Sequence, residues 1–555
     1  MQAGIEELLA KIERNLDLMI STLFSGLTSA GARKPARAAT LCLLAALAAG
    51  SMSSWAAAPS LPSTNVAWIP AVTDADIERC FAKAKAEDKP VLLYWGASWC
   101  PPCNRLKSTL FNREDFAAQS RSFVAVHLDG DRLGAQKLGA RFKVIGYPTV
   151  ILFRPDGAEI TRLPGDVDAP KLMALLQAGL AGGKPVKEIL AGARAGKPLS
   201  VNEWRLLAFY SWETDEAQLV AKEEQPALLE ELAIKSMAAD QETSTRLWLK
   251  ALAASKDGKG VKPDAALRER VRKVLADPAL AREQLDVLTG SAAEIVRALS
   301  ADGDPERAAQ AAGFDVALSR LQADATLSRG DRVSALSARI ELARLGEKKD
   351  AVQVWLPEPL LNEARAVAAL MDREISNGYE RQAVITNVAD MLAQAGLWTE
   401  SDRLLKANLA KSHSPYYLMS QLAGNARKRG QNDEALRWYR QAFARSEGPA
   451  TRLQWGASYL SALVELAPQD ALRIEETATK LFAEAAKDRA AFYERSARSL
   501  RKIVDKLASW NAKGEHAAAM RRLHGRLGSA CAKLAAGDPQ RVTCESLLKD
   551  VLKQA

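Results

Sequence analysis

Short apolar runs and helically spaced apolar residues alternate between residues 60 and 183. Runs bounded by turn or breaker residues predict strands over residues 91–95, 123–129 and 149–153, and a turn at 154–157 predicts a hairpin partner over 159–163. Helical spacing predicts helices over residues 74–88 (capped by Asp74), 131–142 and 168–180, with two shorter helices ending near residues 110 and 120. This order of elements predicts an α/β fold for residues 59–183.

From residue 184 to residue 555 the apolar spacing is helical, so an all-α region is expected. Gly182-Gly183-Lys184-Pro185 marks the change and is interpreted as a linker or hinge. The segment from Ala395 to Glu400 recurs 34 residues later as Arg429 to Glu434, a period typical of tetratricopeptide helix–turn–helix repeats. The helical region has two interpretations. It is either a stack of such repeats, clearest over about residues 385–480, or a plain helical bundle.

Residues 1–58 have the pattern of a leader. Basic residues at 33–37 precede an apolar run at 41–49, and small residues follow at 54–58, which is the order of a secretory signal peptide. The apolar run is shorter than the ~20 residues of a comfortable transmembrane helix, and an uncleaved anchor is the alternative. We therefore expect an exported, periplasmic protein with no stable membrane span after signal cleavage.

Length and charge narrow the class of protein further. With 555 residues the chain is too long for one hydrophobic core, so two or more domains are expected. The net charge of +9 is a weak bias over this length, and no basic run is interleaved with aromatic residues. Nucleic acid is therefore not an expected partner.

The stretch from Trp99 to Cys103, Trp-Cys-Pro-Pro-Cys, follows the first predicted strand and opens a predicted helix. Two cysteines at this spacing meet across one turn, so one thiolate can attack a disulfide while the other resolves the mixed disulfide. A helix N-terminus favours a thiolate, which makes Cys100 the predicted nucleophile and Cys103 the resolving thiol. Zinc is the alternative for such a pair, but the sequence offers no second cysteine pair or histidine cluster. Neither a metal nor a cofactor is predicted.

Together with Gly146-Tyr147-Pro148-Thr149 before the third strand, this order of motifs resembles the thioredoxin superfamily over about 120 residues. The helix before Lys89-Pro90-Val91 and the Thr109-Leu110-Phe111 insert look most like the C-terminal domain of the thiol:disulfide interchange protein DsbD. The resemblance implies a cis Pro148 facing the cysteines and a Tyr147 backbone that pairs with an extended substrate. It also implies that Trp99 shields Cys100 and contacts substrates, for which simple packing is the other interpretation.

The sequence departs from the thioredoxin pattern at the buried acid that relays the proton of the second thiol. Tyr94 stands at that position, Ser98 replaces the acidic neighbour typical of the DsbD domain, and Ala125 replaces the partner lysine. His127, two residues further along the same strand, faces the same side and is a possible proton relay. A core or surface histidine, and relay through water, are the alternatives.

Three more cysteines remain after the predicted signal cleavage. Cys531 and Cys544 lie on the two arms of a predicted helix hairpin and are candidates for a structural disulfide, or two unpaired thiols. Cys80 is expected to be a small buried residue.

The sequence as a whole predicts an exported thiol:disulfide oxidoreductase that acts on protein disulfides, with reductase or isomerase activity favoured because no histidine separates the two cysteines. Such an enzyme needs an upstream thiol electron donor, and the helical repeats could bind a protein partner. The alternative is a periplasmic binding scaffold or holdase that uses the same two modules without real turnover.

Overall fold

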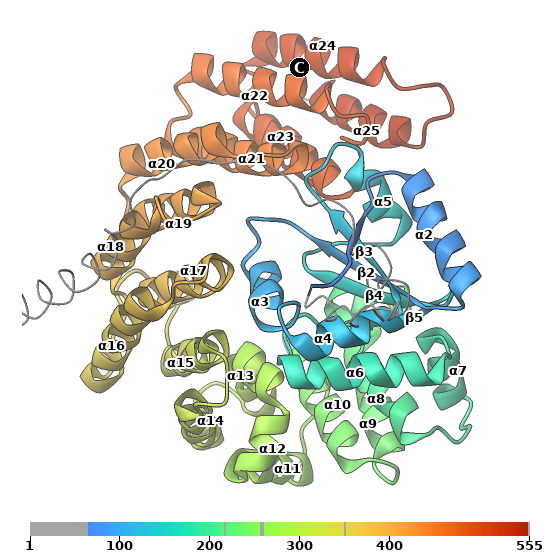
Figure 1. Ribbon diagram of the computed structural model, residues 1–555. Coiled ribbons are helices and arrows are strands. Elements are labelled where there is room, and N and C mark those ends of the chain that lie inside the picture. The colour runs from blue at the N-terminus through green and yellow to red at the C-terminus, as the bar shows by residue number, and fades with distance from the viewer. Residues whose placement is uncertain (1–64, 216–217, 256–259, 349–350, 553–555) are drawn as a thin grey trace, which may run out of the picture. The chain divides into compact units, whose positions relative to one another are not determined.

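The computed structural model describes residues 65–215, 218–255, 260–348 and 351–552, so the predicted leader lies outside the described residues. A five-stranded sheet with the order β1-β3-β2-β4-β5 comes first (Figure 1). Its strands are β1 (Ile69–Pro70), β2 (Val91–Gly96), β3 (Val124–Asp129), β4 (Thr149–Phe153) and β5 (Glu159–Leu163). β3 runs parallel to β1 and β2, whereas β4 is antiparallel to β2 and β5. The four predicted strands are confirmed, and β1 is additional.

Five helices accompany the sheet: α2 (Asp74–Glu87), α3 (Pro101–Thr109), α4 (Glu114–Gln119), α5 (Ala135–Arg141) and α6 (Ala169–Gly182). The predicted cap at Asp74 is wrong, because Thr73 is the N-cap residue and forms a reciprocal capping box with Asp76. The predicted start of α5 at residue 131 is also too early. The chain first turns through Gly134, whose φ is 82°, and the helix begins only after it.

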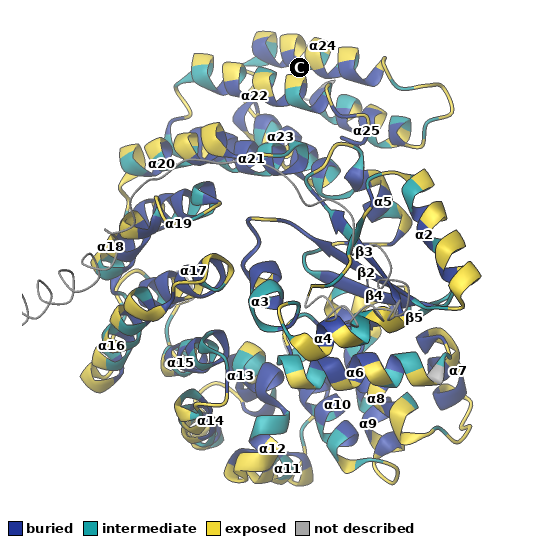
Figure 2. Cartoon of the chain, in the orientation of Figure 1, coloured by how far each residue is buried: buried dark blue, intermediate teal, exposed yellow. Residues whose placement is uncertain are grey.

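The central strand β2 is buried on both faces, as its unbroken apolar run predicted. Its side chains alternate between two hydrophobic cores. Leu92 and Tyr94 belong to one core, and Leu93 and Trp95 to the other. Figure 2 shows the same strand as a dark, fully buried band between the helices.

The remainder of the described chain is helical, as predicted for residues 184 onwards. Its α-helices are α7 (Val186–Arg194), α8 (Val201–Ala208), α9 (Gln225–Ser236), α10 (Gln241–Ala254), α11 (Ala265–Ala276), α12 (Pro278–Glu283), α13 (Leu285–Leu299), α14 (Pro305–Ala323), α15 (Arg329–Ala343), α16 (Glu358–Glu374), α17 (Gly378–Gln394), α18 (Trp398–Asn408), α19 (Pro415–Lys428), α20 (Asn432–Arg445), α21 (Pro449–Leu466), α22 (Ala471–Ala485), α23 (Glu494–Trp510), α24 (Ala517–Cys531) and α25 (Gln540–Leu552). Among the described residues, no helix is long and apolar enough to cross a bilayer.

The 34-residue period is visible in the positions at which helices begin. α18 begins at Trp398 and α20 at Asn432, 34 residues later, and α19 and α21 begin at the same interval. A glycine ends the helix before each of the first two, and both Gly396 and Gly430 have a positive φ, 76° and 73°. The repeated glycine is therefore a left-handed helix terminus, and the region is compatible with tetratricopeptide-like repeats.

Gly182 is the last residue of α6, and Gly183 ends the helix with a left-handed φ of 61°. α7 follows immediately, and its Val186 and Ile189 belong to the same hydrophobic core as Leu172 of α6. One hydrophobic core therefore extends from the sheet into the helical region.

Later helices return to the α/β part of the chain. α17 packs on α3, and α23 packs on α5. Polar contacts accompany this packing: Arg105 of α3 pairs with Asp331 of α15 at 2.6 Å, and the backbone N–H of Gly134 donates to Asp488 at 3.2 Å. Segments more than 200 residues apart thus meet around the cysteine helix.

A disulfide between Cys531 and Cys544 joins α24 to α25, with the two Cα atoms 5.7 Å apart. Both cysteines are buried in the hydrophobic core of the C-terminal helices, together with Leu523 and Leu547. Cys80 is buried and carries a free thiol.

Replacing both Cys531 and Cys544 by alanine should lower the free energy of unfolding by about 3 kcal/mol, because the unfolded chain then gains the conformational freedom that this loop restricts. Denaturant unfolding of the oxidised variant and the wild type measures the difference. Cys80→Ala, which removes a buried thiol outside any disulfide, controls for lost packing. An unchanged midpoint in the double variant would show that the disulfide does not stabilise the fold.

Candidate functional site

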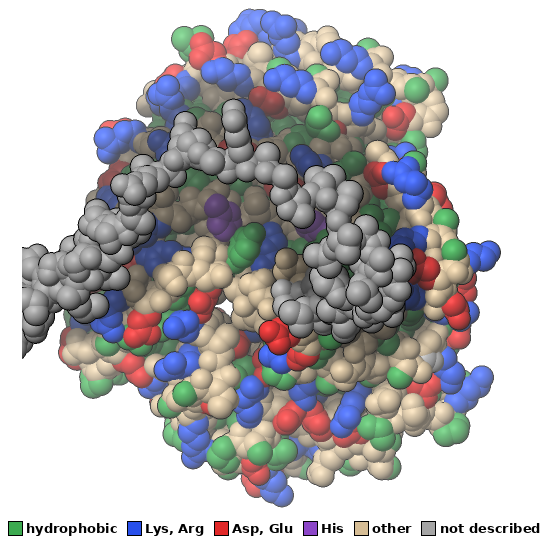
Figure 3. Space-filling view, in the orientation of Figure 1, with side chains coloured by type: hydrophobic (Ala, Val, Ile, Leu, Met, Phe, Trp, Pro, Cys, Tyr) green, Lys and Arg blue, Asp and Glu red, His purple; other side chains and the backbone are tan. Residues whose placement is uncertain are grey.

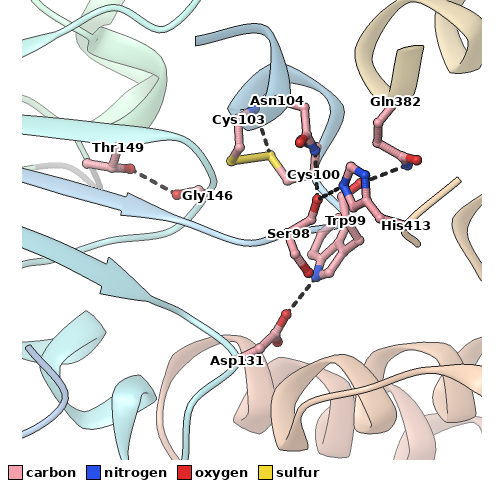
Figure 4. The surroundings of a disulfide bond; sticks show 10 residues. All are labelled: Ser98, Trp99, Cys100, Cys103, Asn104, Asp131, Gly146, Thr149, Gln382 and His413. Atoms are coloured by element: carbon pink, nitrogen blue, oxygen red, sulfur yellow. Dashed lines mark hydrogen bonds between the residues drawn. A yellow bond between two sulfur atoms is a disulfide. The ribbon is translucent and has the colours of Figure 1, made fainter. Parts of the chain in front are cut away.

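Cys100 is the N-cap residue of α3, and Pro101 and Pro102 form the first positions of that helix. Prolines fit there because the first N–H groups of a helix have no partner within it. The Cys100 Sγ accepts a hydrogen bond from the backbone N–H of Cys103 at 3.2 Å, and the two cysteines form a disulfide (Figure 4). After reduction, the same N–H groups and the helix dipole are placed to stabilise a thiolate on Cys100.

Asn104 holds the loop that precedes the two cysteines. Its Nδ2 donates to the backbone carbonyls of Ser98 (2.7 Å) and Cys100 (2.9 Å), and its side chain is fully buried. Sequence reasoning missed this residue, because an asparagine one position after the second cysteine carries no recognisable signal.

The loop before β4 contains the second motif. The Tyr147–Pro148 peptide bond is cis, as the resemblance implied. Thr149 Oγ1 donates to the carbonyl of Gly146 at 2.9 Å, and Gln136 Nε2 donates to the Tyr147 hydroxyl at 3.1 Å. These bonds connect the proline loop to β4 on one side and to α5 on the other.

Trp99 lies against the helical region and is only 9% exposed. Its ring stacks on Tyr417 of α19, with centroids 6.0 Å apart, and meets Trp455 of α21 edge-on at 5.0 Å. Packing, the second interpretation offered for Trp99, is therefore realised. Direct contact between Trp99 and a substrate stays a prediction.

Helical residues also cover the cysteine pair, which leaves Cys100 2% exposed and Cys103 0% exposed. The cysteines share one hydrophobic cluster with Tyr416 and Met419 of α19 and with Trp455. In this conformation, therefore, most of the surface around the disulfide is occupied by the protein's own helices.

Two polar side chains of the helical region bind the backbone of the cysteine loop. Gln382 of α17 donates to the carbonyl of Trp99 at 3.4 Å, and His413 Nε2 lies 3.0 Å from the carbonyl of Ser98 (Figure 4). Ser412 in turn donates to Gln382 at 2.6 Å and fixes the orientation of that amide. The loop is thus held from both α3 and the helical region.

Asp131 links the α/β part to α21 and α23 at the edge of the site. One carboxylate oxygen accepts from the Trp99 indole (2.8 Å), and the other accepts from Thr451 (2.5 Å) and Arg495 (3.1 Å). The Arg495 guanidinium also lies over the rings of Trp99 and Tyr147, 4.7 and 5.3 Å from their centroids. Sequence reasoning missed these residues, because no local pattern relates positions more than 300 residues apart.

A cavity of about 390 Å³ adjoins Cys100. It is lined by Trp95, Trp99, Cys100, Pro101, Pro102, Gln136, Val144, Ile145, Gly146, Tyr147, Tyr417, Gln454, Arg495 and Arg498. The lining thus combines the cysteine loop, the proline loop and three helices of the C-terminal half. Within the described residues, no group of three or more His, Cys, Asp or Glu side chains could hold a metal ion.

Tyr94 occupies the strand position at which a thioredoxin-like pattern has a buried acid. Its ring stacks on His127, with centroids 5.1 Å apart and planes 12° apart. Its hydroxyl lies so close to Gly96 that a Cβ there would come within 2.4 Å. This hydroxyl is buried with no hydrogen-bond partner among the described residues, and burial raises the pKa of Tyr94 well above its usual value. Tyr94 is therefore a neutral phenol and does not replace the carboxylate.

Burial, and to a lesser degree the charge of Lys107, lower the pKa of His127 from 6.5 to about 4. The imidazole is therefore neutral at pH 7 and a weak proton acceptor, and its role as a relay stays a prediction.

Asp129 is a carboxylate that sequence reasoning overlooked. It lies two residues after His127 on β3, opposite Gly96, and burial raises its pKa. Lys107, one helical turn after Cys103, interacts electrostatically with both His127 and Asp129.

The lowered pKa of His127 predicts an acid-dependent loss of stability. Between pH 6.5 and about 4 the unfolded chain binds a proton that the folded protein does not, so stability falls as pH falls through that window. His127→Gln should reduce this loss by about 3 kcal/mol between pH 7 and pH 4. Urea unfolding at several pH values measures it, with His524→Gln as the control. Equal pH dependence in wild type and His127→Gln would contradict the prediction.

Comparisons with known proteins match the part of the chain that contains the two cysteines. The family of the thioredoxin-like domain matches residues 77–180. Thiol:disulfide interchange protein DsbD 2 of Pseudomonas aeruginosa is 33% identical over 120 residues, which are 21% of this chain and 20% of that protein. DsbD of Klebsiella pneumoniae is 28% identical over 160 residues, 27% of this chain and 26% of its own length. The crystal structure of oxidised thioredoxin O1 from Arabidopsis thaliana aligns with 20% of this chain and 95% of its own, at 20% identity and a TM-score of 0.17.

The matched segments thus span only about a fifth to a quarter of these curated relatives. Residues 184–555 lie outside the match to the family. The similarity therefore covers only the part of the chain that carries the cysteine pair.

Proposed function

We propose that this chain, a thiol:disulfide oxidoreductase by its thioredoxin-like domain and its Cys100–Cys103 pair, works as an exported reductase or isomerase of protein disulfides. The observation that carries the proposal is the position of Cys100, which caps α3, is bonded to Cys103 and lines a cavity beside the Tyr147–Pro148 loop. Those are the features that a disulfide-exchange site requires: a stabilised thiolate, a resolving thiol and room for a substrate sulfur.

The exchange then proceeds in two displacements. In the reduced protein, the Cys100 thiolate attacks one sulfur of a substrate disulfide, forms a mixed disulfide and releases the other sulfur as a thiolate. Cys103 loses its proton and attacks Cys100, which releases the second substrate thiolate and forms the disulfide seen in the structure. Two electrons pass to the substrate, and an upstream thiol donor must return them to the cysteine pair.

The direction of the reaction is proposed from the residues between the cysteines. Pro101 and Pro102 carry no charge that would stabilise the reduced form, whereas strong oxidants hold their reduced form very stable. We expect a reduction potential closer to the about −270 mV of thioredoxin than to the about −120 mV of DsbA. Equilibration of the Cys100–Cys103 pair in thiol buffers of defined potential tests this, and a value near −120 mV would overturn the reductase assignment.

Export is proposed from the leader pattern of residues 33–58, which precedes the described structure. N-terminal sequencing of the mature protein tests it, and a mature N-terminus before residue 40 would overturn it. Nucleic acid is not proposed as a partner, and Figure 3 shows basic and acidic side chains interspersed over the visible face.

A binding scaffold or holdase is the second candidate, favoured by the helical cover over Cys100. A covered cysteine pair is suited to capture of a bound client more than to rapid turnover. Protection of an aggregating client by a Cys100→Ser variant would favour this function, whereas loss of all activity in that variant favours the enzyme.

A further inference from the structure

Cys100 lines the cavity, whereas the rest of the cysteine pair is covered. Tyr416, Met419 and Trp455 belong to the same buried hydrophobic cluster as the cysteines, and Trp99 is itself buried against Tyr417. A folded protein that approached Cys100 would have to displace these side chains. A small molecule can instead reach the Cys100 end of the disulfide from the cavity, whose volume of about 390 Å³ is within the range of ligand pockets.

The charged residues that line this cavity are both arginines, Arg495 and Arg498 of α23. Arg495 is committed to internal contacts with Asp131, Thr451 and Gln454. Arg498 donates to Glu494 at 3.0 Å and to the carbonyl of Ile145 at 3.1 Å, and its side chain is still 49% exposed. Because a guanidinium has five N–H donors, Arg498 retains donors for an incoming acceptor.

We propose that the substrate reaching Cys100 through this cavity is a short peptide disulfide with a carboxylate group that Arg498 binds. This proposal rests on the proposed function. The aromatic rings of Trp99, Tyr147 and Tyr417 provide the apolar walls, and the planar guanidinium suits a bidentate carboxylate contact. The ligand is either a free peptide disulfide of low molecular mass or a disulfide in an acidic, flexible segment of a larger protein. The two sources share the same chemistry at the site.

The peptide disulfide is reduced by the same two displacements as a protein disulfide. The reduced pair gives two electrons to the peptide disulfide, whose two sulfurs leave as thiols once each has taken up a proton. Cys100 and Cys103 are left as the disulfide, and an added dithiol such as dithiothreitol restores the reduced pair.

The test compares three small disulfides in a dithiothreitol-driven assay: oxidised glutathione, which is anionic, bis(2-hydroxyethyl) disulfide, which is neutral, and cystamine, which is cationic. Each rate is corrected for direct reduction by dithiothreitol. We expect kcat/KM to be highest for oxidised glutathione. Arg498→Gln should lower the ratio of the anionic to the neutral rate roughly tenfold, the effect of one charge-assisted hydrogen bond. Arg501→Gln, on the same helix but paired with Asp550 and outside the cavity, should leave this ratio unchanged.

A flexible acidic peptide disulfide and folded insulin distinguish the sources. A flexible peptide reduced as fast as oxidised glutathione would admit a segment of a larger protein, whereas a rate at least tenfold slower would limit the substrate to free peptide disulfides. In both cases insulin should be reduced at least tenfold more slowly than oxidised glutathione, and insulin reduced as fast as oxidised glutathione would overturn the proposal. Equal rates for all three small disulfides, or an unchanged ratio in Arg498→Gln, would overturn the anionic class while leaving the oxidoreductase intact. No turnover of any disulfide by the wild type would instead overturn the proposed function itself.

Discussion

Replacing Cys100 by serine is expected to abolish disulfide reduction and return the rate to that of the added dithiol alone. The hydroxyl of serine does not ionise near neutral pH, so the helix terminus has no thiolate to stabilise. The dithiothreitol-driven assay with a peptide disulfide measures the loss. Cys80→Ser, which changes the free buried thiol outside the site, should keep activity. Turnover that survives in Cys100→Ser would remove Cys100 from the mechanism.

Replacing Cys103 by alanine should stop the same reaction one step later. Once the dithiothreitol has been removed, Cys100 of the reduced variant can still attack, but no second thiolate is present to displace the bound half of the substrate, so a mixed disulfide accumulates. Non-reducing mass spectrometry should find one peptide per protein molecule, attached at Cys100. Absence of this adduct would indicate that Cys103 is the attacking sulfur and that the assigned roles are reversed.

The α/β part could be predicted from the sequence because its signals are local. The apolar runs of β2, β3 and β4 are bounded by turn residues, and the cysteines of α3 lie within four positions of each other. The cap of α2 was misassigned because Thr73 and Asp74 are both good capping residues, and only the reciprocal bonds between Thr73 and Asp76 decide between them.

The surroundings of the cysteines could not be predicted, because they depend on the path of the whole helical region. Spacing gave the 34-residue period of α18 to α21, but not the direction in which these helices travel. Nothing near Asp131 in the sequence indicates that Thr451 and Arg495 contact it. The packing of Trp99 against Trp455 could not be located for the same reason, because the local motif contains no information about α21.

The helical cover also changes what the cysteine pair can do. An exposed pair of this type would accept any accessible disulfide, whereas here helices cover the cysteines, and we infer that they select the sulfur that reaches Cys100. Specificity therefore follows from the stability of the contacts between the α/β part and α19, α21 and α23. Asp131 takes part in these contacts twice, through its bonds to Thr451 of α21 and to Arg495 of α23.

Asp131→Ala is accordingly expected to open the site. The change leaves the Arg495 guanidinium, only 11% exposed, without its carboxylate and removes the partner of the Trp99 indole. Loss of one member of such a pair costs about 3 kcal/mol. If the interface between the α/β part and the helices loses all of this free energy, the population of molecules with an uncovered Cys100 rises up to roughly a hundredfold. Alkylation of reduced Cys100 by iodoacetamide and reduction of folded insulin should then both become faster.

Asp402→Ala is the matched control, because Asp402 is equally buried and pairs with Arg429 within the helical region, away from the cysteines. Both variants should unfold at lower denaturant concentration, but only Asp131→Ala should expose Cys100. Asp131→Asn, which keeps an oxygen for the Trp99 N–H, should lie between wild type and alanine. Equal alkylation rates in Asp131→Ala and Asp402→Ala would show that the helical cover does not control access. The exposure of Cys100 would then follow from the lower overall stability that the two variants share.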